Sequence, residues 1–91
     1  MKAFHLLIHG RVQGVWFRAS AQEMAQKLKL KGWVRNTPDG AVEVHIQGED
    51  SSIDKMVAWC NQGPPGAHVD HIDISEVSLN EEFRSFNIRY Y

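Results

Sequence analysis

The fold is decided by residues 33–47, whose sequence is WVRNTPDGAVEVHIQ. Apolar and polar side chains alternate over the second half of this stretch, and a period of two is typical of a strand with one buried face. The apolar positions are Val42, Val44 and Ile46. The preceding Thr37-Pro38-Asp39-Gly40 has the residue types of a tight turn and implies a partner strand at Trp33–Asn36. The stretch therefore predicts a β-hairpin.

A helical pattern lies on each side of this hairpin. Before it, apolar residues recur with a period of about 3.6, and Gly32 is a typical stop for such a helix. These apolar residues are Ala21, Met24, Ala25 and Leu28. After the hairpin, a second helix is expected from about Ser51 to Cys60, with a capping box formed by Ser51 and Asp54. Gly63-Pro64-Pro65-Gly66 then ends this helix in a rigid loop.

Strands are expected towards both ends of the chain. Residues 3–9 alternate, and their apolar face carries Phe4, Leu6 and Ile8. Residues 69–79 form another strand, whose apolar phase slips near Ser75-Glu76 and indicates a bulge or bend. The last strand has Phe86, Ile88 and Tyr90 on one face. The order β-α-β-β-α-β predicts an α+β, ferredoxin-like α/β sandwich: a four-stranded, mostly antiparallel sheet with two helices on one face and its second strand at an edge.

Length and composition limit the possible functions. Ninety-one residues make one domain, residues 1–91, and 43% hydrophobic content with four Phe, three Trp and two Tyr is enough for one core. Ten basic and eleven acidic side chains give a formal net charge of −1. Proteins that bind nucleic acid usually carry a clear basic excess, so no nucleic-acid partner is expected.

The same sequence predicts a cytoplasmic protein without a membrane partner. Its single cysteine, Cys60, cannot form an internal disulfide, and its place on the apolar stripe of the second helix predicts a buried core thiol. The N-terminus has no signal-peptide pattern, and no window approaches the roughly 18 apolar residues of a membrane span. The exposed face with His5, Leu7 and Tyr91 is not strongly apolar, which favours a monomer.

The loop between the first strand and the first helix has the sequence GRVQGVWFR, residues 10–18. Gly10 and Gly14 allow backbone amides to approach a ligand closely. Successive amides that point inward, with a helix N-terminus behind them, form an anion site. Arg18 adds a planar charged group that matches phosphate oxygens. By itself, this loop predicts a phosphate cradle.

Each candidate residue also has a simpler structural interpretation. The two glycines of the loop fit a tight turn that binds no ligand. Arg18 fits a solvated residue in the first turn of a helix, and Asn36 fits a turn residue before the hairpin tip. Arg11 and Arg35 flank the site, as surface charges or as secondary substrate contacts.

The five histidines do not predict a metal site. His5 and His9 share a strand face, but four residues separate them by about 13 Å along an extended strand. His68 and His71 lack the spacing, and the cysteine or carboxylate pattern, that is typical of zinc ligands. We therefore expect no metal.

The chain closely resembles the acylphosphatase family in two segments, GRVQGVWFR at 10–18 and GWVRNTPDGAVEVHIQG at 32–48. The resemblance extends over the whole chain in length and element order, down to the closing Phe86-Asn87-Ile88-Arg89-Tyr90. It implies hydrolysis of a carboxyl–phosphate mixed anhydride, an acyl phosphate, to a carboxylate and inorganic phosphate.

The resemblance also implies roles for individual residues. Arg18 would bind the phosphoryl oxygens and Asn36 would orient the attacking water, as the two catalytic residues, with no metal and no organic cofactor. The other residues that would cradle the phosphoryl group are Arg11, Val12, Gln13, Gly14, Val15, Trp16 and Phe17. Inorganic phosphate would be the product and an inhibitor. Trp16 would pack under the loop or line its entrance, where it could influence the preference for the acyl group.

The chemistry of these residues agrees with such a reaction. Acyl phosphates have a good carboxylate leaving group, so positioning and charge stabilisation matter more than a strong acid. Asn36 can align a water through hydrogen bonds but is a poor proton acceptor. A hypothesis that fits both points is that the bound phosphate itself takes the proton from water.

Two other function classes remain open at this stage. One is a catalytically silent anion-binding or regulatory module, although both Arg18 and Asn36 are present. The other is an RNA-binding domain, since the common RNA-recognition motif shares the same element order. That motif needs stacking aromatic residues on its central strands, and residues 41–47 have none.

Overall fold

The structure, a computed structural model, describes residues 1–90, so the exposed-face residue Tyr91 lies outside it. Elements occur in the predicted order, and the last strand expected around Phe86 and Ile88 is present as β5. They are β1 (Lys2–Arg11), α1 (Phe17–Lys27), β2 (Lys31–Asn36), β3 (Val42–Gly48), α2 (Asp50–Gln62), β4 (His68–Val77) and β5 (Phe86–Arg89). Among residues 1–90, no helix is long and apolar enough to cross a membrane.

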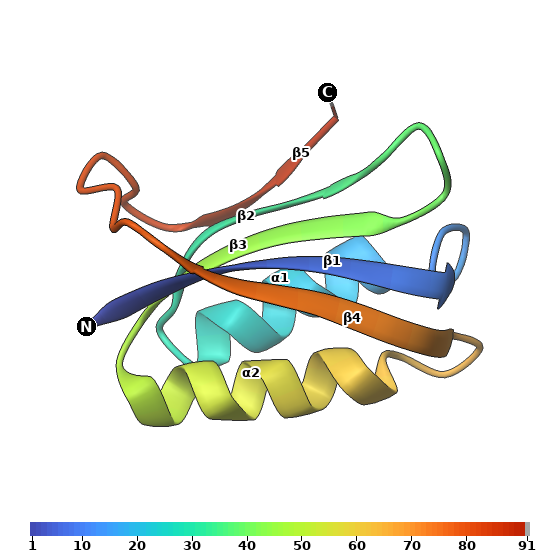
Figure 1. Cartoon of the computed structure of the whole chain (residues 1–91), viewed down its shortest axis with the longest axis horizontal. Helices are drawn as coiled ribbons and strands as arrows, with labels where there is room; N and C mark the ends of the chain where they lie inside the picture. The colour runs from blue at the N-terminus through green and yellow to red at the C-terminus, as the bar shows by residue number, and fades with distance from the viewer. Residues whose placement is uncertain (91) are drawn as a thin grey trace.

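One sheet with strand order β4-β1-β3-β2-β5 carries both helices on the same face (Figure 1). All neighbouring strands are antiparallel except β2 and β5, which are parallel. The ferredoxin-like expectation is confirmed, but the expected four strands are wrong, because the sheet has five. The short β5 pairs along β2 from Gly32↔Phe86 to Arg35↔Arg89, so β2 is not an edge strand.

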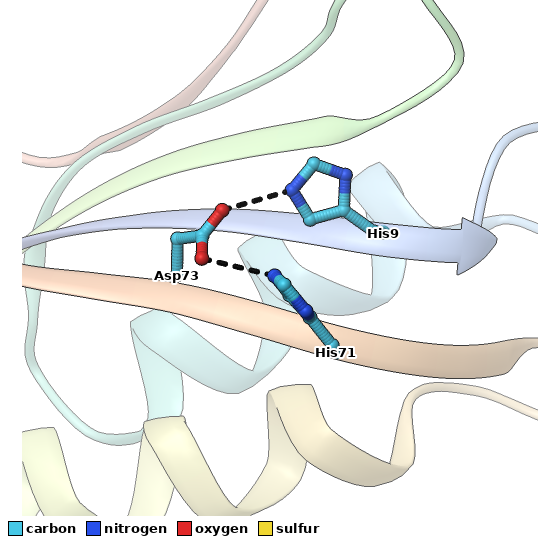
Figure 2. Close-up of side chains that lie close together, drawn as sticks. All are labelled: His9, His71 and Asp73. Carbon is cyan, nitrogen blue, oxygen red and sulfur yellow. Dashed lines mark hydrogen bonds and ion pairs between the residues drawn. The ribbon is translucent and has the colours of Figure 1, made fainter.

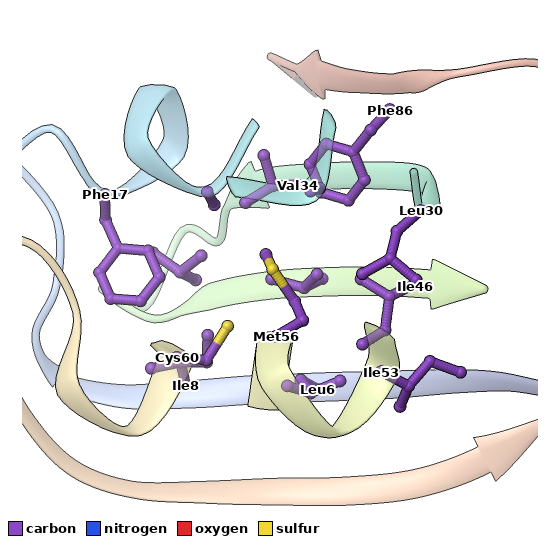
Figure 3. Packing of buried hydrophobic residues seen from close by; sticks show 14 of the residues in the cluster. Leu6, Ile8, Phe17, Leu30, Val34, Ile46, Ile53, Met56, Cys60 and Phe86 are labelled. Carbon is purple, nitrogen blue, oxygen red and sulfur yellow. The ribbon is translucent and has the colours of Figure 1, made fainter. Parts of the chain in front are cut away.

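The core fills the space between the sheet and the helices (Figure 3). The alternation predicted for the strands is confirmed, since Leu6, Ile8 and Val44 are fully buried. From the helix side, the buried residues are Phe17, Ala21, Ala25, Ile53, Met56 and Cys60. Burial raises the pKa of the Cys60 thiol to about 12, so this residue is the inert core thiol that the sequence predicted.

The predicted boundaries of both helices need correction. Helix α1 ends at Lys27, and Lys29 takes the left-handed conformation that follows a helix, at φ 59°. The Leu30 and Lys29 amides donate to carbonyls in the last turn, so the chain has turned away before Gly32, which lies in β2 instead. A Cβ at Gly32 would lie 1.9 Å from the carbonyl oxygen of His45, so close strand packing explains this glycine.

Helix α2 begins at Asp50, with Glu49 as its N-cap residue. The predicted capping box of Ser51 and Asp54 is wrong, because Ser51 lies inside the helix and the N-cap side chain makes no hydrogen bond to the backbone. The helix continues past the expected Cys60 to Gln62, and the predicted stop at Gly63 is confirmed, with φ 73°.

The irregularity of β4 lies at the opposite end of the strand from the predicted one. Pairing with β1 is regular from Ala3↔Val77 to His9↔His71, and the register then shifts so that Gly10 pairs with Val69. The bulge or bend predicted near Ser75-Glu76 is therefore wrong. β4 is an exposed edge strand, and its apolar pattern carries little information on register where side chains face solvent.

Candidate active site

The loop after β1 and the hairpin between β2 and β3 lie at the same end of the sheet (Figure 1). The Gln13 side chain joins them: its Nε2 donates to the carbonyl oxygens of Thr37 and Ala41, at 2.8 Å each. Sequence reasoning placed Gln13 in the cradle but missed this bond, which depends on a contact between segments 24 residues apart. The side chain fixes the loop relative to Asn36, which immediately precedes the hairpin turn.

The hairpin tip is itself held in place by Thr37. The Thr37 amide donates to the Ala41 carbonyl at 2.9 Å, and the Ala41 amide donates back to the Thr37 hydroxyl at 3.0 Å. The same hydroxyl donates to the Asp39 carboxylate, and this bond is the main reason why the pKa of Asp39 lies below its ordinary value. The predicted turn is therefore confirmed as a closed, hydrogen-bonded unit.

The loop backbone turns through two left-handed residues, Gly14 at φ 77° and Trp16 at φ 65°. Helix α1 follows, with Trp16 as its N-cap and a bond from the Ser20 amide to the Trp16 carbonyl. No residue that the structure describes accepts a hydrogen bond from the amides of residues 12–16. These amides and the open first turn of α1 can hold an anion.

A pocket of about 360 Å³ lies in front of this loop. It brings together Arg18 and Asn36, the two predicted catalytic residues, which are far apart in the sequence. Its lining residues are Val12, Gly14, Trp16, Phe17, Arg18, Ala19, Asn36, Ile88 and Tyr90. Three residues of the predicted cradle, Arg11, Gln13 and Val15, do not line it. Ile88 and Tyr90 were not predicted as site residues, because only pairing of β5 with β2 brings the end of the chain here.

Arg18 contributes the positive charge of the pocket. It lies half-buried in the first turn of α1, a turn without acidic residues. Its guanidinium lies 5.3 Å from the ring centre of Tyr90, and it forms no ion pair with any residue between 1 and 90. Its hydrogen-bond donors are therefore available to phosphate oxygens.

Asn36 contributes a hydrogen-bond acceptor. Its Oδ1 is buried and accepts no hydrogen bond from any residue that the structure describes. Buried polar atoms without a partner are rare in folded proteins, and a water or ligand commonly satisfies them. This atom therefore marks a position where a water molecule can donate to the protein.

Trp16 lies at the mouth of the pocket rather than beneath the loop. Its side chain is 81% exposed, whereas the neighbouring Phe17 is buried and packs edge-to-face on Trp59, with ring centres 5.3 Å apart. Phe17 thus anchors the start of α1, and Trp16 remains available to contact a substrate.

Arg35 lies on the opposite face of the sheet from this pocket. Its Nε donates to Glu43 at 2.5 Å, and Glu43 also bonds to His5 at 2.6 Å. Partial burial raises the pKa of Glu43, but the hydrogen bonds from His5 and Arg35 outweigh it, so the pKa lies below its ordinary value. Of the two alternatives for Arg35, a surface charge or a secondary substrate contact, its ion pair with Glu43 on this face does not favour the substrate contact.

Comparison with known proteins identifies the family of this chain. The acylphosphatase family model matches residues 4–88. The chain belongs to the acylphosphatase family. It is 50% identical over 88 residues to an acylphosphatase of Methylococcus capsulatus, covering 97% of this chain and 96% of the relative. It is also 55% identical over 76 residues to an acylphosphatase of Thiobacillus denitrificans, covering 84% and 85%.

Solved structures of the family have the same fold. The crystal structure of acylphosphatase from Bacillus subtilis superimposes with a TM-score of 0.94 at 37% identity and covers 99% of this chain and 100% of that chain. An acylphosphatase from Coxiella burnetii gives a TM-score of 0.92 at 38% identity, covering 97% and 92%. Family membership makes the chain a hydrolase of acid anhydrides with an acyl phosphate substrate, rather than a silent binding module.

Proposed function

We propose that this acylphosphatase holds the phosphoryl group of its substrate with Arg18 and the loop amides, and that Asn36 positions the attacking water. The observation that carries the proposal is a single pocket shared by a guanidinium without an ion-pair partner among residues 1–90 and a buried amide oxygen without a hydrogen-bond donor. The guanidinium can bind an anion, and the amide oxygen can accept a hydrogen bond from a water molecule.

The anion-binding part of the site, formed by the loop amides and Arg18, stabilises the negative charge of the phosphoryl group. Phosphoryl transfer spreads negative charge over the oxygens of the transferred group, so fixed donors aimed at those oxygens lower the barrier. The amides that follow β1 and the first turn of α1 are such donors. Arg18 adds a full positive charge, which no acidic residue in the first turn of α1 neutralises.

Asn36, the uncharged residue of the site, positions the attacking water. A water that donates to Asn36 Oδ1 directs a lone pair at phosphorus. Its oxygen forms a bond to phosphorus while the bond from phosphorus to the carboxylate oxygen breaks, and the carboxylate leaves with the electron pair. An amide cannot take the released proton, so a phosphoryl oxygen receives it.

Several finer features complete the proposal. Inorganic phosphate leaves as the product and competes with the substrate for the cradle. The residues of the pocket supply the required charge and hydrogen bonds without a cofactor, and Trp16 and Tyr90 contact the acyl group. The enzyme acts as a monomeric single domain in the cytoplasm, without a nucleic-acid or membrane partner.

Hydrolysis in ¹⁸O-labelled water tests where the water attacks. Benzoyl phosphate is incubated with the enzyme and a metal chelator, and both products are analysed by mass spectrometry. Attack at phosphorus places the label in inorganic phosphate. Label in benzoate would mean attack at the carbonyl carbon and would overturn the roles of Arg18 and Asn36. Loss of activity with the chelator would show that a metal is required.

A further inference from the structure

Three ligand-type side chains meet on the face of the sheet that the helices leave open. His9 lies near the end of β1, and His71 and Asp73 lie two residues apart on β4. His9 and His71 are direct cross-strand partners, and residues two apart on a strand share a face. Figure 2 shows both imidazole rings directed at the Asp73 carboxylate.

The distances in this cluster are short. His9 Nε2 lies 3.1 Å from Asp73 Oδ2, and His71 Nε2 lies 2.9 Å from Asp73 Oδ1. The two imidazole rings meet edge-to-face with centres 4.9 Å apart. The three ligand atoms all lie within 4.8 Å of one another.

This geometry is close to that of a metal centre. Zinc binds imidazole nitrogen and carboxylate oxygen at about 2.0–2.2 Å, which places tetrahedral ligand atoms about 3.4 Å apart. The three side chains are all solvent-accessible, with exposed fractions of 37% for His9 and 61% each for His71 and Asp73. Small rotations of the side chains therefore bring three ligands onto one ion and leave one position for water.

We propose that His9, His71 and Asp73 form a binding site for a divalent transition-metal ion, with Zn²⁺ as its representative. Two imidazoles and one carboxylate favour Zn²⁺, Ni²⁺ or Cu²⁺ over Mg²⁺ and Ca²⁺, which prefer oxygen ligands alone. On binding, each imidazole carries its proton on Nδ1 and gives Nε2 to the ion.

The ion would act as a clamp between β1 and β4. It would join the two strands at their last regular pair, next to the point where the register shifts and one residue before Gly10, where the cradle loop begins. A ligand that binds only the folded chain stabilises it in proportion to the logarithm of its concentration. The site is separate from the proposed catalytic pocket, which none of these three side chains lines.

Sequence spacing could not reveal this site. Spacing along β1 relates His9 only to His5, whereas its cross-strand neighbour, His71, is 62 residues away in β4. Only the register of β1 against β4 places His9 opposite His71. The signal available from the sequence was limited to the alternation of His71 and Asp73.

Equilibrium dialysis with Zn²⁺ tests the site on the full chain. Wild-type protein is compared with His71→Gln and Asp73→Asn, two exposed positions outside the hydrophobic core. We expect one saturable Zn²⁺ per wild-type chain and at least a tenfold weaker affinity in each variant. The melting temperature of the wild type, and not that of the variants, should rise with Zn²⁺ concentration.

The chain offers a matched control. His68 and Asp70 form a similar exposed pair on the same strand, at 3.1 Å, without belonging to the three-ligand group. His68→Gln should bind Zn²⁺ with wild-type affinity. Wild-type affinity weaker than about 1 mM, or an equal loss of binding in His68→Gln and His71→Gln, would overturn the proposal.

Discussion

The two helices cover the same face of one sheet, yet their N-termini differ in chemistry. Helix α1 begins after a left-handed residue, Trp16, and has no acidic side chain in its first turn. Helix α2 begins after an extended residue, Glu49, and has Asp50 in its first turn. Neither N-cap side chain bonds to the backbone. Both helices present free amides and the positive end of a helix dipole.

The difference shows how one of two equivalent ends becomes the candidate site. At α2, the carboxylates of the chain itself supply negative charge where the dipole favours it. At α1, the loop of amides and Arg18 add positive potential, so we expect an anion from outside the chain to bind there. The fold supplies two such ends, and we expect the preceding loop together with the first-turn residues to distinguish them.

Removal of Arg18 should have the largest effect on the difference between the N-termini of α1 and α2. We expect Arg18→Ala to lower kcat/KM for benzoyl phosphate by about 10³-fold, because a charged donor to the transition state is lost. It should also weaken inhibition by inorganic phosphate. Arg18→Lys should recover only part of the activity, since an ammonium lacks the planar fork. Steady-state kinetics of each variant give these values.

Arg84→Ala is the matched control, because this exposed arginine lies in the loop before β5, away from the pocket. It should keep wild-type kinetics. Equal losses in Arg84→Ala and Arg18→Ala would mean that overall charge, rather than the guanidinium at α1, determines the rate.

The second largest effect is expected from Asn36, which separates water positioning from anion binding. Asn36→Ala should lower kcat by about 10²-fold, since one fixed hydrogen bond to the nucleophile is lost. The inhibition constant of inorganic phosphate should stay nearly constant, because Arg18 and the loop remain. Asn87→Ala, at an exposed asparagine of β5, should leave both values unchanged. A parallel rise in the inhibition constant would place Asn36 in the anion site instead.

Local patterns were sufficient to predict the parts of this site that lie within one segment. The alternation of residues 41–47 and the turn before it predicted the hairpin, and the structure confirms both. The glycine-rich loop before a helical stretch predicted a turn into α1 with Arg18 in the first turn, and the structure shows both; the anion cradle itself is a proposal. In each case the sequence signal itself lies within a few neighbouring residues.

Features that depend on pairing between distant segments could not be predicted in this way. Pairing of β5 with β2 brings Tyr90 to the pocket and gives the sheet its fifth strand. The bond from Gln13 to the hairpin and the approach of His9 to His71 likewise join remote segments. The predicted end of α1 was wrong for another reason. Lys29 shows that a residue other than glycine can adopt the left-handed conformation after a helix when the amides around it donate hydrogen bonds to the last turn.

Gly14 tests whether the loop conformation, and not only its charge, distinguishes α1. An added Cβ would meet no atom within 4 Å, so Gly14→Ala costs only the left-handed backbone strain, about 1–2 kcal/mol. We expect a loss of stability of this size in urea denaturation. If the loop relieves the strain by moving an amide, kcat/KM falls about tenfold.

Gly40 in the hairpin tip provides the control for this experiment. It also has a left-handed φ, 97°, and an added Cβ would again meet no atom within 4 Å. Gly40→Ala should lose similar stability while kcat/KM stays near the wild-type value. Equal losses of activity in the two variants would show that general destabilisation, and not the loop amides, accounts for the effect at Gly14.

The smallest effect is expected at the other helix. Asp50→Asn removes the first-turn charge of α2 and should lower the free energy of unfolding by about 0.3–1 kcal/mol, less at high salt, because a carboxylate interacts favourably with the helix N-terminus. Asp54→Asn, beyond the first turn, should have little effect, and both variants should keep wild-type kinetics.

The Asp50 variant also tests what makes an anion site. If an unneutralised helix end were sufficient, Asp50→Asn would gain a second binding site for inorganic phosphate, visible as added saturable binding in calorimetry. We expect no such gain, because α2 lacks a preceding loop of free amides and has no arginine in its first turn. A second phosphate site in Asp50→Asn would mean that first-turn charge alone distinguishes the two helix N-termini. Its absence would show that α1 owes its role to the combination of open amides, Arg18 and the hairpin that Gln13 holds beside them.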